Sequence, residues 1–289
     1  MASSAFLTRV NLLEILDQQS ATLVVAAAGT LVLVAGGIDL SVGATYFLAG
    51  VVSAHFALTV PAGFAIVLGI LAGTAVGVVN GLVVTILRVD ALITTLATTF
   101  VVTGLASLVT SGNLIVLFNK AAFGSFAQTE FLGVHTSVWV MLIPVIGLAL
   151  LLSRTTLGRY IYAVGGNSSA ARLAGVRVDG VRVTTFVLSG TMAGLAGVID
   201  TSRVLSAGGA SYNTVQLAFT VIAGVVVGGT SILGGDGAVW RTIVGILFIA
   251  LINNGYILLG LDPLYQQITV GVLLIAAVSL DVWSRRRRA

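Results

Sequence analysis

Few residues of this sequence can do chemistry, and the most conspicuous of them is a single carboxylate. Of the 289 residues only 8% are charged, and the chain has no cysteine and two histidines that lie far apart. Thiol chemistry and a histidine metal cluster are therefore excluded. Asp39, in the stretch GGIDLSVG at residues 36–43, is the only formally charged residue between Asp17 and Arg88. We expect no catalytic residue and no metal ligand in this chain.

Asp39 has two interpretations. A lone carboxylate among apolar residues is usually functional or paired. Asp39 and Ser41 also suit the start of the helix that follows, because their oxygens can accept hydrogen bonds from its free backbone N–H groups. We assign Gly37, Asp39 and Ser41 to a structural capping motif of this kind, and a proton-coupling carboxylate is the alternative.

Six amide and hydroxyl side chains within apolar stretches are candidates for lining a pathway through the protein. They are Asn80, Thr94, Thr95, Thr98, Asn253 and Asn254. Such groups suit a neutral polyhydroxylated solute, because they form hydrogen bonds without attracting ions. A structural role is the alternative, since a threonine in an apolar helix can bond its own backbone.

A polar, basic and glycine-rich stretch, GRYIYAVGGNSSAARLAGV, occupies residues 158–176. Asn167 or Ser168 can cap a short helix, residues 170–173 are good helix formers, and Gly175 can end the helix. A solvated loop is the alternative. The paired glycines of this stretch lack the GxxxxGK[ST] pattern of a phosphate cradle, so we expect no ATP hydrolysis on this chain.

A second glycine-rich stretch, GGTSILGG, occupies residues 228–235 and separates two apolar segments. A break of this kind lets two half-helices meet and exposes backbone dipoles. A simple tight turn is the alternative. The residues assigned to this structural motif are Gly228, Gly229, Thr230 and Ser231.

The elements that carry these residues belong in lipid. The chain is 57% hydrophobic, and its charged fraction is far below the roughly one quarter of soluble domains. Nine apolar stretches approach the length of about 20 residues that a membrane-spanning helix needs. They are residues 20–36, 41–60, 63–87, 91–111, 137–152, 184–204, 212–227, 238–259 and 264–283. We predict an all-α, polytopic transmembrane bundle of about nine spans, forming a single domain over residues 1–289.

Glycines spaced four apart predict close helix packing within this bundle. They are Gly69, Gly73, Gly77 and Gly81, with the pairs Gly190 and Gly194 and Gly224 and Gly228. Lining a conduit is the alternative. Outside the spans we distinguish an amphipathic N-terminal segment (residues 1–19), a basic loop (153–183) and a basic tail (284–289).

The arginines predict the orientation. Five of them fall within residues 153–183 and four form residues 285–288, and basic clusters beside apolar spans mark the cytoplasmic side. Counting nine spans places both clusters on that side, and places the N-terminus and residues 112–136 on the other. No soluble domain accompanies the tail, so we expect no nucleic-acid partner.

Four motifs together resemble the permease subunits of ribose/xylose-type ABC sugar importers. They are GGIDLSVG, GRYIYAVGGN…AARLAGV, GGTS…GG and NNG…YQQ, in the family's order, within residues 11–281. The resemblance implies a multi-pass inner-membrane permease, not itself an enzyme, that imports a monosaccharide such as ribose or xylose. It implies a permease dimer in membrane lipid, cytoplasmic ATPase subunits that bind ATP and Mg, and a periplasmic or lipid-anchored sugar-binding protein.

The resemblance also implies that the stretch at residues 167–175 is the family's coupling helix, on which the ATPase docks. The residues assigned to this coupling are Gly166, Asn167, Ala170, Ala171, Arg172, Leu173 and Gly175. Ser168 and Ser169 stand where the family often has an acid, so a salt bridge to the ATPase is not expected there. Family members also usually begin with one further span.

Other departures from the family's sequence pattern leave the identity of the transported solute undetermined. Ala218 and Thr220 replace two acids that are common in the family, and Asp236 stands where a basic or neutral residue is usual. A nucleoside or an autoinducer-2-like solute is the alternative within the family. A self-sufficient secondary transporter or channel is the alternative from another class, but it would need a charge relay within the membrane.

Overall fold

The structure, a computed structural model, describes residues 6–208, 214–262 and 264–286. Its elements, in chain order, are α1 (Arg9–Val34), α2 (Val42–Ala57), α3 (Ala62–Ile86), α4 (Ala91–Thr110), β1 (Leu114–Val116), α5 (Ala121–Gln128), β2 (Glu130–Phe131), β3 (Val134–His135), α6 (Thr136–Arg154), α7 (Thr156–Gly166), α8 (Ser168–Leu173), α9 (Val178–Val204), β4 (Ser206–Gly208), α10 (Thr214–Val227), α11 (Val239–Leu258) and α12 (Leu264–Arg286). The predicted all-α fold is confirmed.

Each predicted apolar stretch coincides with one of these helices. By length and composition, α1, α3, α4, α6, α9 and α11 can cross a membrane, while α2, α10 and residues 264–280 of α12 are shorter apolar helices. The seventh predicted stretch begins at Tyr212, outside the described residues. Residues 9–19 of the expected N-terminal segment continue into the first predicted span as one helix, α1.

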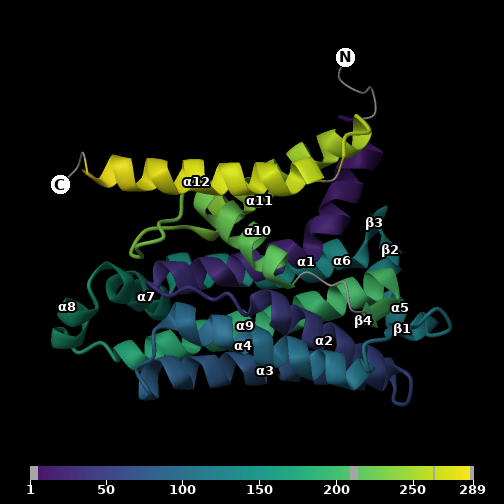
Figure 1. The fold of residues 1–289 in the computed structure, drawn as a ribbon, viewed down its shortest axis with the longest axis horizontal. Coiled ribbons are helices and arrows are strands. Elements are labelled where there is room, and N and C mark those ends of the chain that lie inside the picture. The colour runs from purple at the N-terminus through teal and green to yellow at the C-terminus, as the bar shows by residue number, and fades with distance from the viewer. Residues whose placement is uncertain (1–5, 209–213, 263, 287–289) are drawn as a thin grey trace.

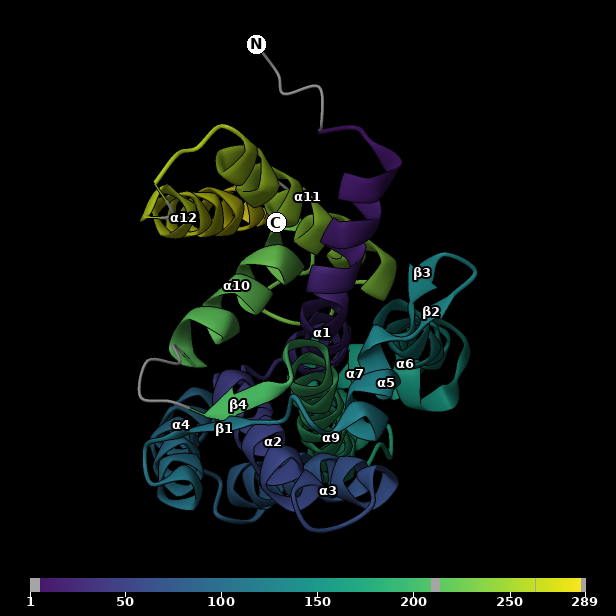
Figure 2. The same ribbon diagram turned by 90° about the vertical axis from the view of Figure 1, so that its right-hand side faces the viewer.

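The long helices lie side by side along one axis, with α7 and α8 at one end and the strands and α5 at the other (Figure 1). Seen along that axis, α1 and α9 lie centrally, between α10–α12 on one side and α2–α4 on the other (Figure 2). Val24 and Ala27 of α1 are completely buried. A helix that is apolar around its circumference belongs in the interior of a bundle, which explains the place of α1.

The glycine spacing brings α3 and α9 into backbone contact, as predicted. A Cβ added to Gly73 would lie 2.5 Å from the carbonyl oxygen of Gly190 and 2.6 Å from the Cα of Gly194. Gly245 of α11 packs against the backbone of Gly224 and Gly228 in the same way, since a Cβ on Gly245 would lie 2.0 Å from the oxygen of Gly224. These helices therefore pack through backbone atoms, for which only glycine leaves room.

We expect Gly73→Ala to destabilise the protein by about 1–3 kcal/mol, because its methyl group overpacks a backbone contact that has no flexible atom to yield. Gly104→Ala on α4 is the matched control, since a Cβ there meets nothing within 4 Å. Thermal unfolding of the purified chain in detergent measures the difference. Equal melting temperatures for the two variants would show that the α3–α9 contact is not tight.

Two short antiparallel ribbons lie at the end opposite α8 (Figure 1). β1 pairs with β4, with Ile115 opposite Ala207, and so ties the segment after α4 to the segment after α9. β2 pairs with β3, with Glu130 opposite His135. Neither ribbon was predicted from the sequence, because strands of two or three residues carry too little alternation to recognise.

Candidate functional site

The extended stretch between α1 and α2 holds a buried carboxylate. Asp39 is 8% exposed. Its Oδ1 accepts hydrogen bonds from the backbone N–H of Ser41 (3.0 Å) and from the Ser41 hydroxyl (2.6 Å). Its Oδ2 accepts a bond of 2.7 Å from the hydroxyl of Ser189 on α9. Both oxygens are thus satisfied, as a buried carboxylate requires, and Asp39 fastens this stretch to α9.

Asp39 thus accepts the N–H of Ser41 at the start of the second predicted span, as expected, but the expectation that the Ser41 side chain caps α2 is wrong. Ser41 is the N-cap residue, but its side chain makes no capping hydrogen bond. Its hydroxyl donates to Asp39 and accepts from the amide of Asn80 instead. A buried carboxyl needs hydrogen-bond donors for its oxygens, so the Ser41 hydroxyl points to Asp39 rather than to the helix end.

Three of the predicted pathway residues meet around this stretch. Asn80 on α3 donates to the Ser41 hydroxyl oxygen at 2.8 Å, and Thr98 on α4 donates to the Asn80 carbonyl oxygen at 2.7 Å. Thr95 accepts a bond of 3.1 Å from the N–H of Leu40. These side chains and Asp39 form one buried network, which we call the Asp39 network. Its members are Asp39, Ser41, Asn80, Thr95, Thr98 and Ser189.

Thr94 differs from its neighbours on α4. It is 5% exposed, and its hydroxyl has no hydrogen-bond partner among the described residues. Asn253 likewise has an unpaired side-chain oxygen in the described part of the chain. Both atoms are buried and have hydrogen-bonding capacity that no described residue uses.

Asn254 does not join the Asp39 network. Its amide instead pairs reciprocally with that of Asn11 on α1, at 2.9 and 3.0 Å. The predicted pathway set therefore divides: the α3 and α4 residues surround residues 36–41, while Asn254 links α11 to the beginning of α1.

Three motifs that are distant in sequence meet at one backbone contact. We call it the glycine junction and define it by Gly36, Gly165, Gly234 and Gly235. The N–H of Gly235 donates to the carbonyl of Val34 at 2.9 Å. A Cβ added to Gly165 would lie 1.7 Å from the same carbonyl oxygen, and one added to Gly234 would lie 2.9 Å from both the Gly165 oxygen and the Gly36 Cα. Glycine is the residue that lets three backbones approach this closely.

The loop at residues 228–237 is a turn closed on itself rather than the meeting of two half-helices. Ser231 donates its N–H to the carbonyl of Asp236 at 2.9 Å, and Gly229 has a left-handed φ of +88°. Asp236 also pairs with Arg241 of α11 at 2.8 Å. This geometry favours the tight-turn interpretation.

Tyr162 fastens α7 to this loop. Its hydroxyl donates to the carbonyl of Gly237 at 2.6 Å. Burial raises the pKa of the Tyr162 phenol, a shift that Asp236 adds to and Arg241 opposes. The hydroxyl therefore stays protonated and can donate its hydrogen bond to the Gly237 carbonyl.

The predicted short helix is present as α8. The side-chain oxygen of Asn167 accepts from the N–H of Ala170 at 2.9 Å, and Gly175 has a φ of +84° just past the helix end. These are an N-cap and a left-handed glycine stop. Ala171 is 6% exposed, whereas Leu173 is 92% exposed. The helix thus packs on one side and presents a leucine on the other.

The other residues assigned to the stretch lie close by. Arg172 pairs with Asp179 at 3.2 Å, which joins α8 to the first turn of α9. A Cβ on Gly166 would meet nothing within 4 Å. The preceding helix α7 was missed by the sequence analysis, because Gly158, Gly165 and Gly166 weaken its helical signal. Its buried Ile161 nevertheless anchors it to the core.

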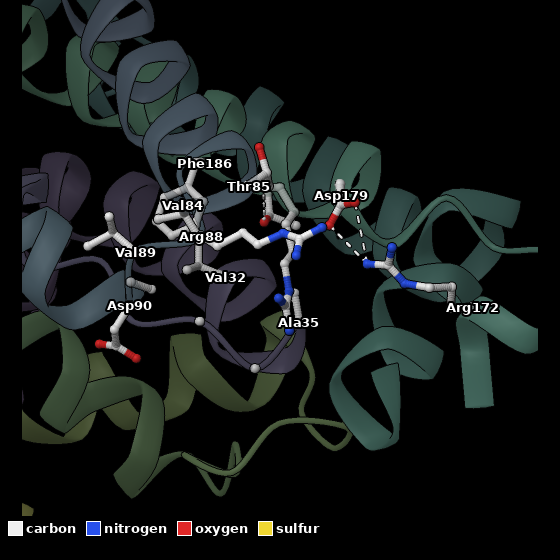
Figure 3. A pocket seen from close by; sticks show the side chains of 15 residues that line it. Val32, Ala35, Val84, Thr85, Arg88, Val89, Asp90, Arg172, Asp179 and Phe186 are labelled. Carbon is white, nitrogen blue, oxygen red and sulfur yellow. Dashed lines mark hydrogen bonds and ion pairs between the residues drawn. The ribbon is translucent and has the colours of Figure 1, made fainter. Parts of the chain in front are cut away.

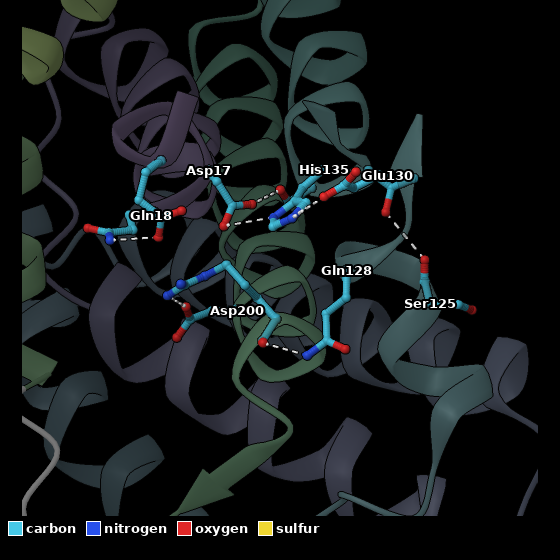
Figure 4. Close-up of polar contacts among 11 residues, drawn as sticks. Asp17, Gln18, Ser125, Gln128, Glu130, His135 and Asp200 are labelled. Carbon is cyan, nitrogen blue, oxygen red and sulfur yellow. Dashed lines mark hydrogen bonds and ion pairs between the residues drawn. The ribbon is translucent and has the colours of Figure 1, made fainter. Parts of the chain in front are cut away.

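A second polar cluster, which the sequence analysis also missed, lies at the opposite end (Figure 4). The buried Asp17 of α1 accepts a hydrogen bond from Ser137 and lies 3.4 Å from Nδ1 of His135. Nε2 of His135 lies 3.7 Å from Glu130. No signal within α1 points to partners so far along the chain. Within the described ranges, no group of three or more His, Asp or Glu side chains is placed to hold a metal ion.

Comparisons with known proteins all identify transport permeases. The family described as "Branched-chain amino acid transport system / permease component" matches residues 11–278. The ribose import permease protein of Escherichia coli (strain K12) is 38% identical over 283 residues, covering 96% of this chain and 88% of that protein. No solved structure matches the chain.

Two further relatives carry other sugars in their names. The D-allose transport system permease protein of Escherichia coli (strain K12) is 36% identical over 280 residues, covering 96% of this chain and 84% of that protein. The L-arabinose ABC transporter permease protein of Azospirillum brasilense is 35% identical over 289 residues, covering 98% of this chain and 83% of that protein.

Proposed function

This chain belongs to the branched-chain amino acid transport system permease family, and we propose that it is the membrane subunit of an ABC importer for a monosaccharide. It forms the translocation pathway across the inner membrane, while separate ATPase subunits bind ATP and Mg and hydrolyse the nucleotide. The sugar permeases among its relatives support this assignment.

The observation that carries the coupling proposal is the exposed side of α8. Leu173 is 92% exposed on a capped helix whose other side packs against the protein. Leaving a leucine in water forgoes roughly 1.5–3 kcal/mol of burial free energy, which a docked partner recovers. We infer that the cytoplasmic ATPase covers α8, gripping it by shape and apolar contact, because Arg172 is already paired with Asp179.

The glycine junction connects α8 to the residues that we propose to line the pathway. α7 leads directly into α8 and contributes Gly165 to the junction, where its backbone contacts the residues around Val34 and Gly36. Three residues beyond Gly36 is Asp39, the centre of the Asp39 network. A movement of α8 driven by ATP therefore displaces residues 36–41, and with them the polar side chains of α3 and α4. Packed elements of this kind switch between discrete arrangements rather than deforming continuously.

A neutral polyol suits the pathway. The Asp39 carboxylate is enclosed by its own hydrogen bonds, and the side chains of α3 and α4 that join its network, Asn80 and Thr98, are neutral. Such groups bind hydroxyls without attracting ions. We propose ribose or xylose, because the ribose permease is 38% identical to this chain.

The remaining partners follow from the two ends of the bundle. The arginines around α7 and α8 favour a cytoplasmic position for that end, and α12 runs back toward it (Figure 1). We therefore propose a cytoplasmic C-terminus. The end that carries β1 and β4 then faces outward and receives a periplasmic or lipid-anchored binding protein. We propose a second copy of this chain as the other half of the pore.

Leu173→Asp is expected to abolish sugar-stimulated ATP hydrolysis and transport in the reconstituted importer, while the variant inserts and melts normally. Insertion and melting stay normal because Leu173 makes little contact within this subunit. Activity is lost because the new carboxylate replaces the apolar group that the ATPase covers. Leu173→Met, which keeps an apolar surface, is the matched control and should retain activity. Deletion of residues 167–175 should also abolish coupling, and transport that survived it would refute the assignment of α8.

A further inference from the structure

A basic cavity opens beside α8 and is separate from the Asp39 network. It has a volume of about 350 Å³ and is lined by the facing ends of α1, α3, α4 and α9, together with Arg172 of α8. Figure 3 shows Arg88, Arg172 and Asp179 around it. Arg182 also lines it, so that three guanidinium groups share one cavity.

Two of these three guanidinium groups form no ion pair with a described residue, and the cavity's three arginines outnumber its two aspartates, Asp90 and Asp179. Arg172 is neutralised by Asp179 at 3.2 Å. Asp90 bonds the first N–H groups of α4, at 2.9 Å from that of Leu92, and its carboxylate points away from Arg88 (Figure 3). Arg88 and Arg182 have no ion pair with any described residue. The cavity therefore has a positive surplus that suits an anion with several oxygen acceptors.

The surroundings of the cavity point to the source of that anion. Next to it along α3 and α4, Ile86 is 69% exposed, Leu87 67% and Ile93 60%. These side chains form an apolar surface that starts at the cavity and follows helices long enough to span a membrane. A free anion makes no use of such a surface, whereas the acyl chains of a lipid cover it.

We propose that this cavity binds the phosphate of an anionic glycerophospholipid. Arg88 and Arg182 hold the phosphate oxygens, and the acyl chains lie along the exposed side chains at the ends of α3 and α4. Basic pockets between transmembrane helices on the cytoplasmic side bind anionic headgroups in this way. Gly36 and Gly37 line the same cavity, so the bound headgroup also braces the stretch that leads to Asp39.

The test is native mass spectrometry of the full chain released from vesicles that contain phosphatidylglycerol and phosphatidylcholine. The wild type should retain phosphatidylglycerol selectively. The double variant Arg88→Gln, Arg182→Gln should bind it about thirtyfold more weakly, at the free energy of a surface arginine for each of two charges. The control is Arg154→Gln, Arg159→Gln, which removes two exposed arginines outside the cavity and should bind as the wild type does.

Two results would overturn the proposal. The first is equal retention of phosphatidylglycerol by the cavity variant and the control variant. The second is release of the bound species by millimolar inorganic phosphate or glycerol phosphate, which would identify a free phosphate as the occupant. Neither result depends on transport, so both are distinguishable from a failure of the proposed function.

Discussion

Replacing Gly165 by alanine is expected to abolish transport, although the substitution adds only one methyl group. The new Cβ would lie 1.7 Å from the carbonyl oxygen of Val34 and 2.7 Å from the backbone nitrogen of Gly235. Backbone atoms of three segments cannot yield as a flexible side chain does, so the junction must open. We expect a loss of stability of about 1–3 kcal/mol or more and a failure of ATP hydrolysis to drive uptake.

Gly147 of α6 provides the control, because a Cβ there meets nothing within 4 Å. Gly147→Ala should keep both stability and transport. The two variants are compared by thermal unfolding of the purified chain and by sugar uptake per ATP hydrolysed in proteoliposomes. Tight coupling in Gly165→Ala would contradict the role of the glycine junction.

The second large effect is expected at Asp39. Asp39→Ala leaves the hydroxyls of Ser41 and Ser189 without their acceptor, and both residues are almost completely buried, at 1% and 0% exposure. Each buried polar group that loses its partner costs about 1–3 kcal/mol. We expect a strongly lowered melting temperature and little uptake, because residues 36–41 are no longer fastened to α9.

Asp39→Asn separates the hydrogen bonds from the charge. Its amide oxygen still accepts a hydrogen bond and its amino group can donate to a serine oxygen, so we expect substantial transport. Normal expression with complete loss of uptake in Asp39→Asn would show instead that the carboxylate charge itself is needed. That outcome would revive the alternative of a proton-coupling residue.

The sequence predicted the structure best where the deciding contacts lie within one helix or one turn. Glycines four apart on α3 lie on one face, so their packing against a neighbouring backbone is a local property. The cap at Asn167 and the stop at Gly175 are local as well, because each bonds atoms within a few residues. The bounds of α8 and the glycine contacts of α3 were predictable for this reason.

The candidate site was less predictable because it is made by residues from distant segments. Gly165 looks like any glycine in a polar loop until Val34 and Gly235 are placed beside it. Ser189 is an ordinary serine in an apolar helix, and no local pattern marks it as a partner of Asp39. The capping role expected for Ser41 failed for the same reason, since the competing acceptor becomes decisive only after the stretch is buried.

ATP-driven movement of α8 reaches residues 36–41 only if the segments that meet at the glycine junction, namely α7 with α8, residues 34–36 and the loop at residues 228–237, move as one body. Because the chain has no cysteine, Ser169→Cys and Leu233→Cys, both at exposed positions, allow two spin labels to be placed without other changes. The measurement is the distance between the labels in the assembled importer, with and without ATP, by pulsed electron paramagnetic resonance. We expect the same distance in both states. A distance that changes on ATP binding would show that the glycine junction does not hold the two segments together.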